Sequence, residues 1–195
     1  ELPTPVGGVQ SFAFSPDGNQ LVTAAGSNAR IWDAQKLNEI SAFPHDHETL
    51  LDVAVDPSGA ILATAARDGF VRLWDMAGGQ LIGELAHDDS VRAVAFSTDG
   101  RYLASAANDR TVRVWDVQRG NELNRLLLGE PANAVAFSPD GLNLVTGDAG
   151  GSVRIWPLQI KALIADACAR LARRLSETEV KTHLMGLPSL HPCDN

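Results

Sequence analysis

The chain has 195 residues, of which 45% are hydrophobic and 21% charged, and its formal net charge at pH 7 is −8. These values are typical of a globular protein, and no apolar run is long enough to span a membrane. The acidic balance repels phosphate backbones and so disfavours direct nucleic-acid binding. We expect a cytoplasmic protein with no membrane contact.

A tryptophan and a turn glycine each recur every 41 or 42 residues. The tryptophans are Trp32, Trp74, Trp115 and Trp156, and the glycines are Gly18, Gly59, Gly100 and Gly141. The tryptophan is followed by Asp in three copies and by Pro in the fourth. A unit of about 40 to 45 residues that ends in Trp-Asp is typical of a four-stranded propeller blade. The repeats cover about residues 1–33, 34–75, 76–116 and 117–157.

Each repeat contains three short apolar runs separated by turn sequences. In residues 91–116 the first turn reads Ser-Thr-Asp-Gly and the second Asn-Asp-Arg, which predicts three strands with two tight connections. The fourth strand of each unit is expected between repeats, at residues 39–43, 80–85 and 122–127. One such unit buries little on its own, so neighbouring blades must stack to form a core.

Across residues 9–156 these motifs resemble the WD-repeat β-propeller family. The resemblance implies an all-β propeller with four blade repeats in residues 1–158, and favours a part of a larger propeller because most members have seven blades. The alternative is a four-bladed ring that residues 1–5 would close.

Residues 159–195 are expected to form a short α-helical C-terminal tail. An apolar stripe of helical period runs through Ile164, Cys168, Leu171 and Leu175. The segment resembles the tail of large bacterial multidomain WD-repeat proteins. We expect a free Cys168 thiol, although a bridge to Cys193 stays open.

The third repeat contains four residues that could carry chemistry: His87, Ser105, Asp109 and Trp115. A Ser, a His and an Asp can together activate a hydroxyl nucleophile. In the family that the chain resembles, however, residues at these positions form a hydrogen-bonded structural tetrad, and we expect that role and no catalytic residue.

The other repeats match the tetrad to different degrees. The second contains Thr64, Asp68 and Trp74, with either His45 or His47 as the imidazole. The first and fourth lack the Asp and the His, and Gly150 occupies the Asp position of the fourth. These outer copies are expected to lack the network and to be less rigid.

Other polar motifs are expected to be structural. A metal site needs three or four converging ligands, and the two imidazoles around Asp46 have no further Cys or His near them in sequence. We therefore expect no metal and no cofactor. An arginine stands two residues before each tryptophan, at Arg30, Arg72, Arg113 and Arg154, and a solvated or cation–π role is expected for it.

The loops before the first and third strands of each repeat should emerge on one face, called the rim here. It contains eight acidic residues, Asp46, Glu48, Asp68, Asp88, Asp89, Asp109, Glu130 and Asp148, against Arg67 and Arg110. Asp68 and Asp109 are assigned to tetrads. We expect the other six to attract a protein or peptide with a basic patch, bound mainly through Glu48, Arg67, Asp88, Asp89 and Asn108. A solvated acidic surface is the alternative.

Taken together, these features predict a non-enzymatic protein-interaction or ligand-sensing scaffold. The resemblance suggests the C-terminal module of a larger, bacterial signalling or defence protein. The alternatives are a purely structural propeller arc, or the regulatory part of an enzyme whose catalytic domain lies upstream. Missing blades or self-association are expected to complete the fold.

Overall fold

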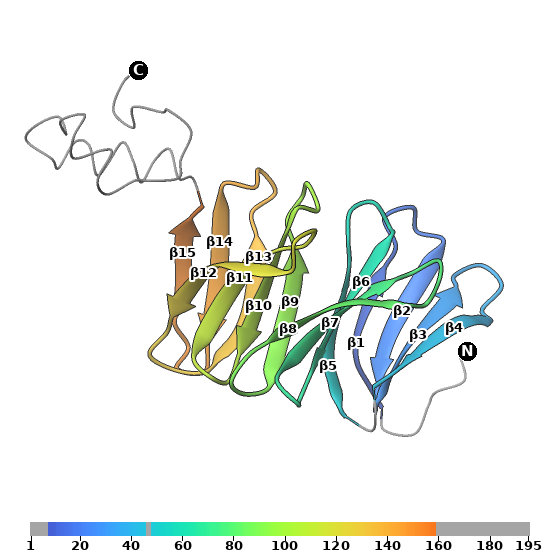
Figure 1. The fold of residues 1–195 in the computed structure, drawn as a ribbon, viewed down its shortest axis with the longest axis horizontal. Coiled ribbons are helices and arrows are strands. Elements are labelled where there is room, and N and C mark those ends of the chain that lie inside the picture. The colour runs from blue at the N-terminus through green and yellow to red at the C-terminus, as the bar shows by residue number, and fades with distance from the viewer. Residues whose placement is uncertain (1–7, 46–47, 159–195) are drawn as a thin grey trace, which may run out of the picture. The chain divides into compact units, whose positions relative to one another are not determined.

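The computed structural model describes residues 8–45 and 48–158, which form fifteen strands in four antiparallel sheets (Figure 1). The first blade contains β1 (Val9–Phe14), β2 (Gln20–Ala25), β3 (Asn28–Asp33) and β4 (Glu39–Pro44). The second contains β5 (Leu50–Val55), β6 (Ile61–Ala66), β7 (Phe70–Asp75) and β8 (Leu81–Ala86). The third contains β9 (Val91–Phe96), β10 (Tyr102–Ala107), β11 (Thr111–Asp116) and β12 (Asn121–Leu127).

The fourth blade contains three strands within the described residues, β13 (Ala132–Phe137), β14 (Asn143–Asp148) and β15 (Val153–Pro157). Strands that follow one another in sequence pair in every blade, so each sheet is a simple meander. The predicted all-β fold of four repeated antiparallel sheets is thereby confirmed for the described residues. The helical tail predicted for residues 159–195, with Cys168 and Cys193, lies outside the described residues. Where the structure describes the chain, no helix is long and apolar enough to cross a bilayer.

Each blade is punctuated by a turn that a side chain closes. Gly18 has φ +71°, a left-handed conformation that a side chain would strain. Asp17 accepts hydrogen bonds from the Ser15 hydroxyl at 2.6 Å and from the Asn19 amide at 3.0 Å. The equivalent pairs in the third and fourth blades are Ser97 with Asp99 and Ser138 with Asp140. In these three blades the Asp-Gly pair therefore stabilises the turn between the first and second strands.

Every blade has two different faces, because side chains alternate along a strand. We call them the Trp face, which carries the repeated tryptophan, and the aliphatic face. In the second blade the Trp face presents Leu62 and Trp74, while Val71 and Leu73 lie on the aliphatic face.

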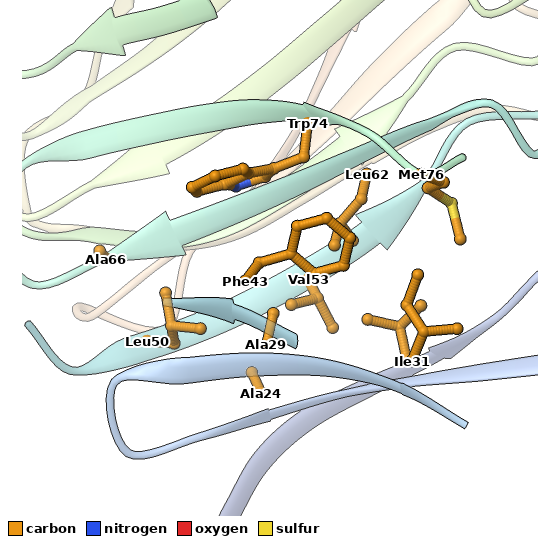
Figure 2. Packing of buried hydrophobic residues seen from close by; sticks show 11 residues of the cluster. Ala24, Ala29, Ile31, Phe43, Leu50, Val53, Leu62, Ala66, Trp74 and Met76 are labelled. Carbon is orange, nitrogen blue, oxygen red and sulfur yellow. The ribbon is translucent and has the colours of Figure 1, made fainter. Parts of the chain in front are cut away.

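The core lies between blades, where the aliphatic face of one packs against the Trp face of the next. Figure 2 shows the first such junction, in which Ile31 and Phe43 of the first blade meet Val53, Leu62 and Trp74 of the second. The second junction repeats the arrangement between the second and third blades. The β9 strand contacts β13 as β5 contacts β9. Each blade therefore depends on its neighbours for its core.

Asp52 joins the innermost strands of three blades. Its carboxylate accepts a hydrogen bond from the Ser11 hydroxyl of β1 at 2.6 Å and another from the Val94 amide of β9 at 2.9 Å. Burial raises the pKa of Asp52, and these hydrogen bonds only partly offset that effect. The other repeats have Ser11, Ala93 and Ala134 at this position. The carboxylate is thus a single connection across two blade junctions.

Candidate functional site

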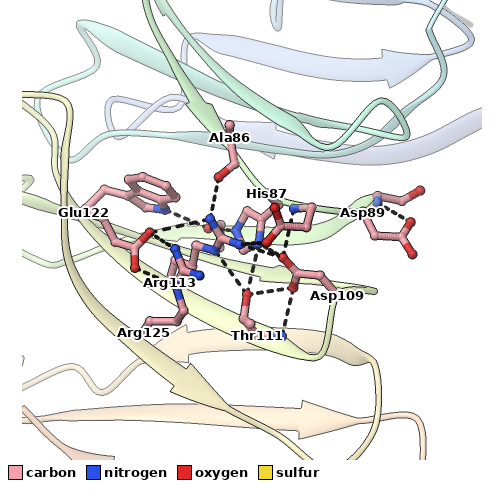
Figure 3. Close-up of polar contacts among 12 residues, drawn as sticks. Ala86, His87, Asp89, Asp109, Thr111, Arg113, Glu122 and Arg125 are labelled. Carbon is pink, nitrogen blue, oxygen red and sulfur yellow. Dashed lines mark hydrogen bonds and ion pairs between the residues drawn. The ribbon is translucent and has the colours of Figure 1, made fainter.

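The four tetrad residues of the third blade are joined in one series of hydrogen bonds. Figure 3 shows two of them, His87 and Asp109, beside Arg113. Trp115 Nε1 donates to Ser105 Oγ at 2.8 Å, and Ser105 Oγ lies 2.6 Å from His87 Nε2. His87 Nδ1 lies 2.9 Å from Asp109 Oδ2. With the proton on Nδ1, the histidine donates to Asp109 and accepts from Ser105, so all four polar groups are satisfied.

This geometry resembles a hydrolytic triad, but a substrate cannot reach it. Ser105 is completely buried, and Trp115 occupies the space beside its hydroxyl and uses its free lone pair. A nucleophile must approach the reacting carbon directly, with room for the developing oxyanion nearby. The arrangement leaves each of these polar side chains with a hydrogen-bond partner inside the blade.

The protonation states of His87 and Asp109 follow from their surroundings. Burial lowers the pKa of His87, and the hydrogen bond and charge of Asp109 only partly offset that effect. Burial alone would raise the pKa of Asp109, but hydrogen bonds from the Thr111 hydroxyl, the Asp88 amide and His87 outweigh it and lower the pKa to about 2. At neutral pH the histidine is uncharged and the aspartate is ionised.

Arg113 is buried beside the tetrad and connects Asp109 to the exposed Asp88. Its Nη2 donates to Asp109 at 3.0 Å and to Asp88 at 2.5 Å, and its Nη1 donates to the Ala86 carbonyl at 2.8 Å. Glu122 lies 3.5 Å from Nη1. The solvated or cation–π role expected for the repeated arginine is therefore wrong at this position, where the guanidinium is an ion-pair centre.

The second blade contains a related network. Trp74 Nε1 donates to Thr64 Oγ1 at 3.0 Å, which lies 2.7 Å from His45 Nε2. His45 is thus the imidazole at this hydroxyl, while His47 lies outside the described residues. Asp68 forms an ion pair with Arg72 at 2.7 Å. The Arg72 guanidinium also lies 5.4 Å from the Phe70 ring centroid, a cation–π contact.

The two outer blades keep more of the network than expected. Trp32 Nε1 donates to Thr23 and Trp156 Nε1 to Thr146, both at 2.9 Å. In the fourth blade Arg154 donates to Asp148 at 3.1 Å. Asp148, two residues before Gly150, therefore supplies the carboxylate that Gly150 cannot provide at the Asp position of this repeat. A hydroxyl nine or ten residues before each tryptophan was the sequence signal for these pairs.

The structure brings the rim segments of neighbouring blades together. The Ser90 hydroxyl donates to the Arg67 carbonyl at 2.9 Å, and the Asn108 amide donates to the Ser90 carbonyl at 2.9 Å. Asn108 also accepts a hydrogen bond from Arg92 Nε at 2.8 Å. The loop before β9 is therefore hydrogen-bonded to the β6–β7 turn of the second blade and to the β10–β11 turn of the third.

The acidic residues of this rim differ in their availability. Glu48, Asp89 and Glu130 are exposed, and the carboxylate of Asp89 accepts a hydrogen bond from the Ser90 amide. Asp88 is exposed but paired with Arg113. Asp148 is buried against Arg154, which corrects the expectation that it faces solvent. Among the described residues no cluster of His, Cys, Asp and Glu could hold a metal ion, and Asp46 lies outside them.

Three relatives match less than half of the chain. Telomerase protein component 1 of Mus musculus is 29% identical over 89 residues, which are 46% of this chain and 3% of the relative. Nuclear distribution protein PAC1 of Arthroderma otae is 33% identical over 106 residues, with 42% and 23% covered. The intraflagellar transport protein 122 homolog of Xenopus tropicalis is 30% identical over 91 residues, with 46% and 7% covered.

The chain therefore spans less than a quarter of the length of these relatives. Four segments, residues 2–33, 38–75, 79–116 and 125–157, match the WD domain, G-beta repeat. Each matched segment ends at the residue that follows a repeated tryptophan, which is also the last residue of the third strand of a blade. The chain belongs to the WD40 repeat family.

Proposed function

We propose that this chain is a non-enzymatic protein-interaction scaffold that binds a basic protein or peptide segment on its rim. The observation that carries the proposal is the exposed carboxylates of Glu48 and Asp89 on a surface that hydrogen bonds hold together across two blades. The tetrads beneath it are buried and supply rigidity, a structural role that we also propose for them.

The names of the relatives support a scaffold. They refer to telomerase, nuclear distribution and intraflagellar transport, which have no reaction in common. What the matched regions share with this chain is the repeat. A function that rests on a binding surface rather than on conserved chemistry fits that variety. The wider context that we propose is a larger bacterial signalling or defence protein, which the resemblance of the C-terminal tail supports.

The partner contacts proposed for the rim are unequal. Glu48, Arg67 and Asp89 present exposed charged groups, whereas Asn108 is engaged by Arg92 and Asp88 by Arg113. A cationic side chain that approaches Asp88 must share its carboxylate with Arg113. We therefore assign the main attraction to Glu48 and Asp89, with Asp88 and Asn108 at the edge of the contact.

The test is binding of a fluorescent lysine-rich peptide, measured by anisotropy at several salt concentrations. The double variant Glu48→Gln/Asp89→Asn should weaken binding, and the affinity of the unmodified chain should fall as salt screens the charges. The matched control is Gln35→Lys/Gln118→Lys, which changes the net charge equally at exposed turns on the opposite side of the strands. Equal loss in both variants would show that only net charge matters and would remove the case for the rim.

A further inference from the structure

Within residues 8–45 and 48–158, no strand or loop packs on the aliphatic face of the fourth blade. Val153 is 73% exposed and Ile155 is 68% exposed. Their counterparts in the second blade, Val71 and Leu73, are 0% and 2% exposed because the third blade packs on them. The described part of the chain thus leaves exposed here the apolar side chains that every inner blade buries.

The Trp face of the first blade is open at its inner strand. Phe12 is 66% exposed and Phe14 is 58% exposed. Val53 and Val94 take the place of Phe12 in the next two blades and are buried at 4% and 6%, each in the junction with the preceding blade. The first blade therefore presents two aromatic rings where its successors meet a neighbour.

These two open faces are the complementary halves of a junction that the molecule already contains. At the first two junctions between blades an aliphatic face packs on a Trp face. The face of the fourth blade has the composition that fits the inner strand of a Trp face, and β1 of the first blade presents such a strand, while Trp32 behind it is already buried. We propose that two copies of this chain associate head to tail, with Val153 and Ile155 of one copy packed against Phe12 and Phe14 of the other.

The number of blades favours a closed pair over a filament. A junction between two different faces generates either a ring or an open polymer. With four blades in each copy, two copies supply eight, which lies at the upper end of the range of about four to eight blades in known propellers. Three copies would supply twelve. We therefore infer a ring of two copies with two identical junctions.

Electrostatics separates this association from peptide binding on the rim. Each copy carries a formal charge of −8, so two copies repel each other at low salt. Screening weakens that repulsion, and the apolar contact itself does not depend on opposite charges. Added salt should therefore strengthen self-association while it weakens binding of a basic peptide. Failure of one proposal leaves the other testable.

The experiment measures the mass of the 195-residue chain in solution by light scattering over a range of concentrations. The unmodified chain should reach the mass of two copies. Phe12→Lys and Ile155→Lys should each give a monomer, because every junction of the pair then contains a buried lysine. Ile82→Lys, at an exposed isoleucine of β8, is the matched control and should retain the paired mass.

Mixing the two face variants distinguishes head-to-tail pairing from a symmetric contact. A 1:1 mixture of Phe12→Lys and Ile155→Lys keeps one unmodified junction and should form a heterodimer that neither variant forms alone. A monomeric unmodified chain, an assembly larger than two copies, pairing that survives either substitution, or a mixture that stays monomeric would each overturn the proposal. Circular dichroism of every variant checks that the blades remain folded; both replaced side chains are largely exposed in the single chain.

Discussion

The third and fourth blades have the same strand plan but very different surroundings. In the third, Arg113 is buried and paired with Asp88 and Asp109, and every residue of β11 is buried. In the fourth, Arg154 is partly exposed and β15 leaves two aliphatic residues open to solvent. Both blades contain the tryptophan–hydroxyl pair. Within the described residues, β11 lies between β10 and β12, whereas β15 is the edge strand of its sheet, and its side chains are correspondingly more exposed.

The largest expected effect is at the two tryptophans. Trp115→Ala should lower the free energy of unfolding by about 3 to 5 kcal/mol, because it removes a buried ring and leaves Ser105 without its donor. Trp156→Ala should cost clearly less, since that ring is half-buried. Chemical denaturation measures both values. Equal losses would contradict the link between burial and cost; the comparison is made at concentrations where light scattering shows a monomer, so that self-association does not contribute.

Removing the carboxylate that pairs with the repeated arginine should also destabilise the third blade more than the fourth. Asp109→Ala should cost about 1 to 3 kcal/mol, because the buried His87 loses its acceptor and the buried Arg113 loses one of its carboxylate partners. Asp148→Ala should cost less, since the Arg154 guanidinium can turn to water. The measurement is the shift in unfolding midpoint of each variant. A larger loss at Asp148 would contradict the view that burial determines the cost.

Acid should destabilise the third blade in two steps. The folded pKa of His87 is lowered, so the unfolded chain binds the proton more readily and stability falls as pH drops below about 6.5. The folded pKa of Asp109 is about 2, so its contribution is present above about pH 4 and is lost as pH falls towards 2. Unfolding midpoints measured between pH 8 and pH 2 test both steps. His87→Gln should remove the upper step and leave the lower one.

The smallest expected effect is in the turn before β11. Arg110 has φ +66°, whereas the second and fourth blades have Gly69 and Gly151 in the same left-handed position. Arg110→Gly relieves a strain of about 1 kcal/mol, but glycine loses more entropy on folding, so the net gain should stay below about 1 kcal/mol. Gly151→Arg should destabilise the fourth blade by a similar amount. Thermal melting compares the two, and a stabilising Gly151→Arg would contradict the explanation.

Much of the fold follows from the sequence because the repeat fixes it. The period of the tryptophans and glycines predicted the number of blades, and the strands between repeats were found at the expected places, for example β4 at Glu39–Pro44. The position of Asp148 could not be predicted, because its carboxylate reaches the arginine from a different point in the turn. Such substitutions keep a contact while they break the spacing that alignment relies on.

The polar contacts between blades could not be predicted from the sequence either. Asp52 stands where the other repeats have small residues, and no pattern within one repeat shows that its partners lie on β1 and β9. The repeat describes what each blade does for itself, whereas side chains that reach across junctions depend on the packing of successive blades. The contact between Asp88 and Arg113 is of the same kind, because no pattern within one repeat predicts it.

Asp52 also offers a way to observe the junctions separately from the blades. The Val94 amide donates to a carboxylate of the preceding blade, so its proton is released to solvent when the second and third blades part, even while both sheets stay intact. Amide hydrogen exchange at this one position would then report on hinge-like opening between blades. Asp52→Ala should accelerate exchange at Val94 far more than at the sheet amides around it.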